Sequence, residues 1–256
     1  MYLVKVPIFL KYNFNPSHKI FQTLFCNLTL AIYSPLMYNN FITNIFKKTM
    51  TDYKELIKNF TEEDYKENRV NLHIHTTYSD GKGEFSDIIK QAKNYKAIAI
   101  SDHNTIQGYL ENKIPNNVIP AVEFDVWCGY VFMHLLAYGI DVNSEHLKPF
   151  LAKSKRETEW DIVRIFAKRN IKKLIHAIHK AGGIAVIAHP ACCWALNLDR
   201  FIKKLKRYGL DGVEVYYPYP RHRGIIKFNT VENVKKIAQK HNLIMTGGTD
   251  LHDQRL

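Results

Sequence analysis

From Val70 onward, short apolar runs alternate with longer stretches in which apolar residues recur every three or four positions. Short apolar runs are typical of buried strands, and the longer period is typical of amphipathic helices. We predict seven strands, at Val70–His75, Ala97–Ser101, Val118–Phe124, Tyr130–Tyr138, Gly183–Ala188, Gly212–Tyr217 and Leu243–Thr246. We predict helices at Phe85–Asn94, Ser144–Ala152, Leu198–Tyr208 and Thr230–His241, and a longer one with room for a break at Glu157–Ala181.

The order of these elements indicates the fold class. Strands and helices mostly alternate, which predicts an α/β protein with a largely parallel sheet, open or closed. The connection from Phe124 to Tyr130 is too short for a helix, so these two strands are expected to form a hairpin.

The first 49 residues differ in composition from the rest. They hold five lysines and no Asp, Glu or Gly. The stretch Phe21–Phe41 is apolar, but Gln22, Asn27 and Pro35 interrupt it, and a membrane helix needs about 20 consecutive apolar residues. We interpret residues 1–49 as a poorly ordered or misassigned extension, and residues 50–256 as one domain with no membrane anchor.

Charge and cysteine content limit the classes of function. The net charge is +12, and removing the five N-terminal lysines leaves +7 over the other 207 residues. A moderately basic protein attracts anionic substrates, phosphate esters among them. The four cysteines form no C-x-x-C pair, which argues against a zinc ribbon or a thioredoxin-type site. Reduced thiols in the cytoplasm are the simplest interpretation.

Histidines and carboxylates gather in or just after the predicted strands. Side chains at i and i+2 of a strand point to one face, so His73 and His75 project together. One His-x-His pair is common by chance. Here, however, every predicted strand but one carries or is followed by a possible metal ligand, and the remaining strand offers Glu214, which we interpret as structural or supporting. The candidates are His73, His75, Asp80, His103, Glu123, His134, His189, Asp250 and His252.

Six imidazoles and three carboxylates meeting at the carboxyl ends of strands are enough for two or three divalent metals. The nitrogen and oxygen donors suit manganese, zinc or iron without any thiolate. Glu123 is the candidate bridge between two cations.

These segments resemble the PHP (polymerase and histidinol phosphatase) family of metal-dependent phosphoesterases. The matching segments occur in the family's order, from Asn71 to His252, and a match in several parts is more specific than any single motif. They are Asn71–Gly81, Ile100–Thr105, Val122–Glu123, His134–Leu136, Ala188–Pro190 and Gly247–His252.

The resemblance implies a distorted seven-stranded, TIM-like (β/α)7 barrel with a centre of three metals. His73, His75, Glu123 and Asp250 correspond to the ligands of the first metal. Asp80, His103 and His252 correspond to those of the second, and Glu123, His134 and His189 to those of the third. Only Asp141–Ala181 stands where free-standing relatives usually carry a long helical insertion.

We expect metal-activated water to hydrolyse a small phosphorylated substrate, such as a nucleotide or an RNA end with a 3′ phosphate. Asp102 is the candidate residue to orient His103 or another ligand. His222 is the candidate proton donor, and Arg221 and Arg223 are candidates to grip the phosphate. For the two arginines a solvated basic loop is the slightly favoured alternative.

Three alternatives stay open at this point. A histidinol-phosphate or other small-metabolite phosphatase would use the same metals. A nuclease that cuts internal phosphodiesters ranks lower, because few aromatic and basic residues alternate along the chain. A non-catalytic, metal-stabilised PHP module serving a partner belongs to a different class, and the complete set of nine ligands argues against it. Neither the oligomeric state nor the native metal follows from the sequence.

Overall fold

A computed structural model describes residues 53–166, 168–218 and 229–256, and the interpretation of residues 1–49 lies outside this part of the chain. All seven predicted strands are present within a few residues of their expected bounds. They are β1 (Val70–Ile74), β2 (Ala97–Ile100), β3 (Ala121–Cys128), β4 (Val131–Tyr138), β5 (Ile184–Ile187), β6 (Gly212–Tyr216) and β7 (Ile244–Gly247).

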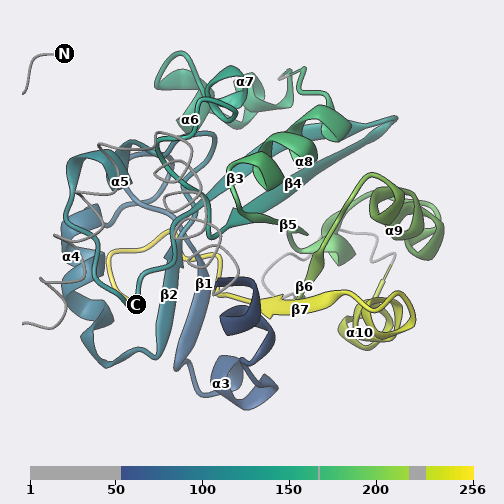
Figure 1. Cartoon of the computed structure of the whole chain (residues 1–256), viewed down its shortest axis with the longest axis horizontal. Coiled ribbons are helices and arrows are strands. Elements are labelled where there is room, and N and C mark those ends of the chain that lie inside the picture. Colours follow the sequence, from purple (N-terminus) through teal and green to yellow (C-terminus); the bar gives the residue numbers. More distant parts are fainter. Residues whose placement is uncertain (1–52, 167, 219–228) are drawn as a thin grey trace, which may run out of the picture. The chain divides into compact units, whose positions relative to one another are not determined.

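The strands divide between two sheets (Figure 1). β1 and β2 form a parallel pair. The second sheet has the order β3-β4-β5-β6-β7, in which β4 runs antiparallel to both neighbours and β5, β6 and β7 are parallel. The predicted α/β class and the predicted hairpin of β3 and β4 are therefore confirmed.

Isolated bridges span the gaps between the two sheets. Ile74 pairs with Leu251 just after β7, and Ile98 of β2 pairs with Val118 just before β3. Because these contacts do not extend into continuous ladders, the described strands do not close into one barrel, and the barrel that the resemblance implies is not confirmed.

The long helices form where an apolar stripe coincides with a good N-terminal cap. In α9 (Leu198–Arg207) the side chain of Asn197 accepts a hydrogen bond from the backbone N–H of Arg200 at 2.9 Å. The buried face of α9 has helical spacing and consists of Leu198, Phe201, Ile202 and Leu205. α8 (Ile171–Lys180) and α10 (Val231–Lys240) begin in the same way, at Asn170 and Thr230.

One helix prediction needs correction, and the break allowed for in another is present. Ser144–Ala152 holds only a 3-10 turn, η2 (Lys148–Phe150), since Pro149 has no N–H to extend a longer helix. Glu157–Ala181 is broken into α6 (Arg156–Glu159), α7 (Asp161–Ile165) and α8, and the first break lies at Trp160, which has an extended backbone.

Several short elements were not predicted. Residues 53–58 are helical, followed by α3 (Glu62–Lys66) and α5 (Gln107–Glu111). α3 buries only Asp64 and begins with a capping box formed with Thr61, so no apolar stripe in the sequence indicates this helix.

The predicted Phe85–Asn94 helix is present as α4 (Phe85–Gln91) followed by η1 (Ala92–Asn94). A further short element, η3 (Pro190–Cys192), follows β5.

Every residue of β1, β2 and β5 is buried. This explains why β2 and β5 are continuous apolar runs, whereas β1 buries the polar residues Asn71 and His73 as well. α8 packs against β3 and β5, while α10 packs against β6 and β7 (Figure 1).

No helix within the described ranges is long and apolar enough to cross a membrane. Cys128, Cys192 and Cys193 are free thiols.

Candidate metal centre

The first two candidate ligands stand at the end of β1. His73 lies in the strand and His75 directly after it, and both side chains are fully buried. The backbone N–H of His75 donates to the carbonyl of Leu251, and the N–H of Leu251 donates to the carbonyl of His73. These bonds place the segment after β7 beside the end of β1.

A tight loop returns Asp80 to the pair. A Cβ at Gly81 would lie 2.4 Å from the carbonyl atoms of His75 and 2.6 Å from the nitrogen of Thr76, so only glycine fits there. The buried carboxylate of Asp102 holds this loop. It accepts hydrogen bonds from the N–H of Thr76 (2.7 Å), from the hydroxyl of Thr76 (2.6 Å) and from the hydroxyl of Ser79 (2.7 Å).

Asp102 was expected to orient His103 or another ligand, and its hydrogen bonds go to the loop that carries the candidate ligand Asp80. No hydrogen bond joins Asp102 to His103 among the described residues. Asp102 can position a candidate ligand, but it does so through backbone and hydroxyl groups. Arg221, His222 and Arg223 lie outside the described residues.

Glu123 of β3 lies at the centre of the cluster. One carboxylate oxygen, Oε2, is 3.2 Å from Nε2 of His73 and 3.3 Å from Nε2 of His75. The same oxygen is 3.3 Å from Nε2 of His103. The other oxygen, Oε1, is 3.3 Å from Nδ1 of His134 and 3.5 Å from Nε2 of His189.

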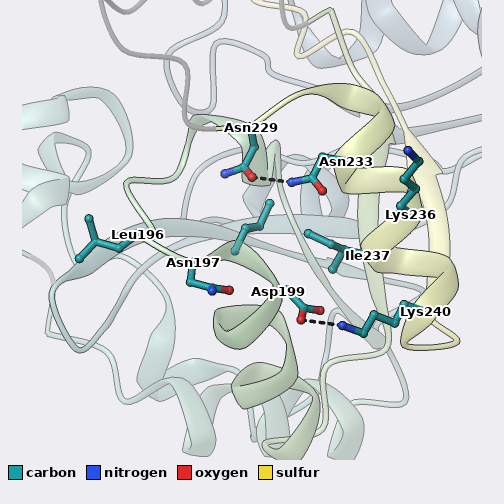
Figure 2. A pocket seen from close by; sticks show the side chains of 9 residues that line it. Leu196, Asn197, Asp199, Asn229, Asn233, Lys236, Ile237 and Lys240 are labelled. Carbon is teal, nitrogen blue, oxygen red and sulfur yellow. Dashed lines mark hydrogen bonds and ion pairs between the residues drawn. The ribbon is translucent and has the colours of Figure 1, made fainter.

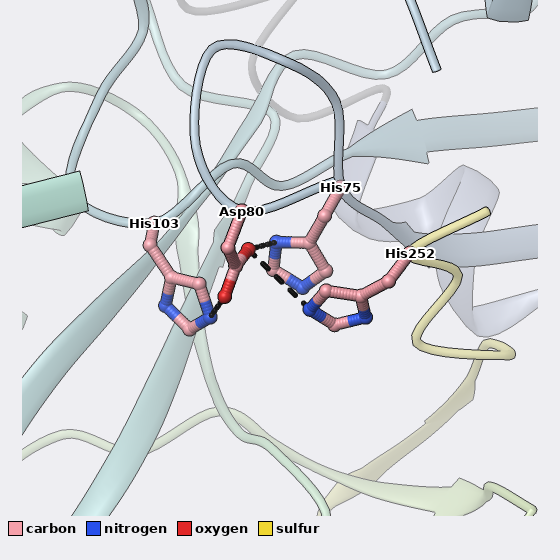
Figure 3. A group of neighbouring side chains, drawn as sticks. All are labelled: His75, Asp80, His103 and His252. Atoms are coloured by element: carbon pink, nitrogen blue, oxygen red, sulfur yellow. Dashed lines mark ion pairs between the residues drawn. The ribbon is translucent and has the colours of Figure 1, made fainter. Parts of the chain in front are cut away.

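A second carboxylate, Asp80, gathers three of the imidazoles (Figure 3). Its Oδ1 is 3.6 Å from Nδ1 of His75 and 3.3 Å from Nε2 of His252. Its Oδ2 is 3.6 Å from Nε2 of His103. Asp250, the third predicted carboxylate, is 3.1 Å from Nε2 of His75 and 3.4 Å from Nε2 of His73.

All nine candidate ligands thus meet in one cluster, although they come from segments spread along the chain from β1 to the loop after β7. Four overlapping groups have donor atoms close enough to share an ion. They are His75–Asp80–His103–His252, His73–Glu123–His189, His73–His75–Asp250 and His103–Asp125–His134.

The donor chemistry of the cluster fits divalent cations. Two ligands that share a tetrahedral zinc at about 2.0–2.2 Å lie about 3.4 Å apart, and the separations above are 3.1–3.6 Å. Among the described residues, both carboxylate oxygens of Glu123, both ring nitrogens of His75 and Nε2 of His73 are buried without a hydrogen bond. Buried polar atoms normally have hydrogen-bond partners, so these atoms fit a site that holds divalent cations.

The charged groups of the cluster compensate one another. Burial works against the charged forms, yet the carboxylates raise the pKa of His75 to about 9 and that of His134 to about 10. Burial likewise opposes ionisation of Glu123, but the charges of His73 and His134 hold its pKa well below the usual range. For His103 burial prevails and lowers the pKa to about 3.

Three supporting residues surround the ligands. Glu214, the polar residue of β6, accepts from Nδ1 of His73 at 2.9 Å and from the backbone N–H of His189 at 2.8 Å, which fits the supporting role expected for it. Asp125 and Arg164 were not predicted. Asp125 is buried in β3 beside two histidines, and Arg164 of α7 reaches Oδ2 of Asp80 at 2.8 Å.

A separate hollow of about 410 Å³ lies between α9 and α10 (Figure 2). Its polar side chains largely pair with one another, as in Asp199 with Lys240 (2.8 Å) and Asn229 with Asn233 (2.7 Å). None of the nine candidate ligands lines it, so it is not part of the cluster.

Together, the fold and the site define an α/β protein with a buried histidine–carboxylate centre of the kind that binds divalent cations. The family model of the PHP domain matches residues 71–245. This chain belongs to the PHP domain family.

Two proteins with similar sequences match this chain over very different shares of their own length. An uncharacterised protein of Methanocaldococcus jannaschii is 29% identical over 195 residues, which cover 67% of this chain and 95% of that protein. A PolC-type DNA polymerase III of Staphylococcus saprophyticus is 38% identical over 64 residues, which cover 23% of this chain but only 4% of the polymerase.

Two solved structures share the fold. One is described as a metal-dependent phosphoesterase of Bifidobacterium adolescentis, with a TM-score of 0.59, 22% identity, and coverage of 72% of this chain and 88% of that one. The other is described as an amidohydrolase of Chromobacterium violaceum with bound sulfate and no metal, with a TM-score of 0.58, 19% identity and the same coverage.

Proposed function

We propose that this chain is a hydrolase that cleaves phosphate esters with three divalent cations, held by the nine candidate ligands. The observation that carries the proposal is the convergence of six imidazoles and three carboxylates on the buried Glu123. Manganese, zinc and iron suit this donor set. When bound, such cations neutralise phosphoryl oxygens and lower the pKa of a water molecule toward neutrality.

The protein's own residues fix the geometry of the site. Glu123 contacts ligands from β1, β4 and the loops after β2 and β5, so it is placed to bridge two cations. Asp80 and His252 lie at the partly exposed edge of the cluster, with 18% and 39% of their side chains exposed. The substrate is therefore expected to approach beside them, while the buried ligands exclude bulk water from the other side.

The strand arrangement belongs to the same proposal. We infer that the seven strands form the family's distorted barrel, which the bridges Ile74–Leu251 and Ile98–Val118 support at the two gaps between the sheets.

For the substrate we propose a nucleotide or RNA end with a 3′ phosphate. Beside the Asp80 loop lies a hollow of about 460 Å³, whose lining includes Tyr78, Lys153 and Lys155. An aromatic ring can stack on a base and lysines can pair with a second anionic group. The positive net charge of the chain favours the same class of substrate.

A panel of phosphate esters tests this specificity. With manganese present, we expect kcat/KM for a nucleoside 3′-monophosphate and for a 3′-phosphorylated oligoribonucleotide to exceed that for histidinol phosphate by at least about tenfold, which corresponds to about 1.4 kcal/mol. Preference for histidinol phosphate would move the assignment to a small-metabolite phosphatase. Absence of turnover with every ester, despite bound metal, would favour a non-catalytic module.

Metal binding is expected to release protons. In the metal-free protein His75 and His134 hold protons up to pH values of about 9 and about 10, and a cation must displace them. Titration calorimetry with zinc at pH 7.5, in two buffers of different ionisation enthalpy, should give apparent enthalpies that differ. Equal enthalpies in the two buffers would contradict this prediction.

The same shifts fix the direction of the pH dependence. Because the folded pKa values lie above the ordinary value of 6.5, these histidines stabilise the metal-free fold fully below that pH and progressively less as pH rises toward 9–10. Metal affinity should rise over the same interval, since fewer protons remain to be displaced.

A further inference from the structure

Asp125 is a carboxylate of the cluster that lies outside the nine candidate ligands. It stands two residues after Glu123 on β3, so both side chains point to the same face of the sheet. Asp125 is completely buried. In the hairpin it pairs directly with His134 of β4.

One oxygen of Asp125 meets two of the imidazoles. Oδ1 is 3.2 Å from Nε2 of His134 and 3.5 Å from Nδ1 of His103. The opposite nitrogens of the same rings face Glu123, at 3.3 Å from Nδ1 of His134 and 3.3 Å from Nε2 of His103. Each ring therefore stands between Glu123 on its inner side and Asp125 on its outer side.

Asp125 is itself held rigidly. The side-chain amide of Asn104 donates to Oδ2 of Asp125, and the side-chain carbonyl of Asn104 accepts from the backbone N–H of Asp125 at 3.1 Å. Arg169 donates to the backbone carbonyl of Asp125 at 3.1 Å. The buried guanidinium of Arg164 lies with Nε 3.8 Å from Oδ1 of Asp125 and with Nη1 bonded to Asp80.

We infer that Asp125 is a positioning residue that fixes the ring orientation and the metal-facing nitrogen of both His103 and His134. This inference rests on the proposed function, in which the two histidines serve different cations. A carboxylate that accepts a hydrogen bond from the outer N–H of a ligating imidazole sets the tautomer of that ring and raises its basicity. One side chain would then couple two metal positions.

The alternative is that Asp125 ligates a further cation together with the outer nitrogens of the two rings. The structure disfavours it for two reasons. A neutral imidazole that gives one nitrogen to a cation keeps its proton on the other, so both rings would have to become imidazolates. The guanidinium of Arg164 also lies close to Oδ1, where it would repel a cation.

The test replaces Asp125 with asparagine, which keeps the shape and removes the charge. Zinc affinity, measured by competition with a chelator, is expected to fall by about 10–100-fold while the number of bound ions stays the same. The matched control is Asp211→Asn. The Asp211 carboxylate, 11% exposed, contacts His179 and Lys54 away from the cluster, so this variant should bind zinc as the unchanged protein does.

A measurement on the unchanged protein covers the case in which Asp125→Asn fails to fold. In zinc-loaded protein labelled with 15N-histidine, long-range proton–nitrogen spectra should place the ring proton of His103 on Nδ1 and that of His134 on Nε2. The opposite tautomer in either ring would overturn the inference.

The remaining outcomes are also decisive. Unchanged zinc affinity in Asp125→Asn would overturn the inference, and so would the loss of one ion per chain, which would make Asp125 a ligand. Failure of the proposed function would appear differently, as an unchanged protein that binds no metal or turns over no phosphate ester.

Discussion

Replacing His73 and His75 together with alanine is expected to lower manganese-dependent hydrolysis of a chromogenic phosphate ester by at least about 10³-fold, since cations of this kind contribute several kcal/mol to transition-state stabilisation. Both imidazoles contact Glu123 and Asp250, so their removal takes two of the four ligands proposed for the first cation. The initial rate at saturating manganese is the measurement.

The matched control removes two exposed imidazoles, by the double substitution His146→Ala and His176→Ala. This variant should keep the rate of the unchanged protein. Hydrolysis by the His73/His75 variant at more than about a tenth of the original rate, in protein that is folded by circular dichroism, would place the chemistry elsewhere.

Glu123→Gln is expected to have the second largest effect. The glutamine is nearly isosteric but carries no charge, while five imidazoles lie within 3.5 Å of the original carboxylate. Losing the shared ligand should remove at least one cation per chain. In the metal-free protein, removing one partner of buried ion pairs should lower the free energy of unfolding by about 3–5 kcal/mol.

Metal content by elemental analysis and denaturant unfolding of the metal-free protein measure the two effects. Glu232→Gln on the exposed side of α10 is the matched control and should change neither quantity. If Glu123→Gln retains the full metal content, Glu123 does not bridge cations, even if the variant is less stable.

The sequence predicted best those features that depend on residues close to one another along the chain. Short, mostly apolar runs predicted the buried strands, and the polar residues within or just after these runs predicted which side chains gather in the cluster. The short Phe124–Tyr130 connection predicted the hairpin. Each of these inferences needs only burial and spacing, which a single sequence shows directly.

Asp125 shows where local reasoning fails. The strand was expected to end at Phe124, directly before this carboxylate. The structure continues β3 to Cys128 with Asp125 buried. Its partners Asn104, Arg164 and Arg169 come from distant segments, so nothing near Asp125 in the sequence indicates that its burial is compensated.

Arg164 was missed for a related reason. It falls within the predicted Glu157–Ala181 helix, where a single arginine is expected to lie on the solvent-exposed side. The break at Trp160 reorients the chain so that α7 turns this arginine toward Asp80. The orientation of a four- or five-residue helix depends on tertiary contacts, which periodicity does not report.

Elemental analysis of the purified full-length chain, after saturation with manganese or zinc and removal of loosely bound ions, tests the central claim most directly. The account predicts three cations per chain, and fewer in the His73/His75 double alanine variant. A chain that holds one cation or none, while remaining folded, would contradict it.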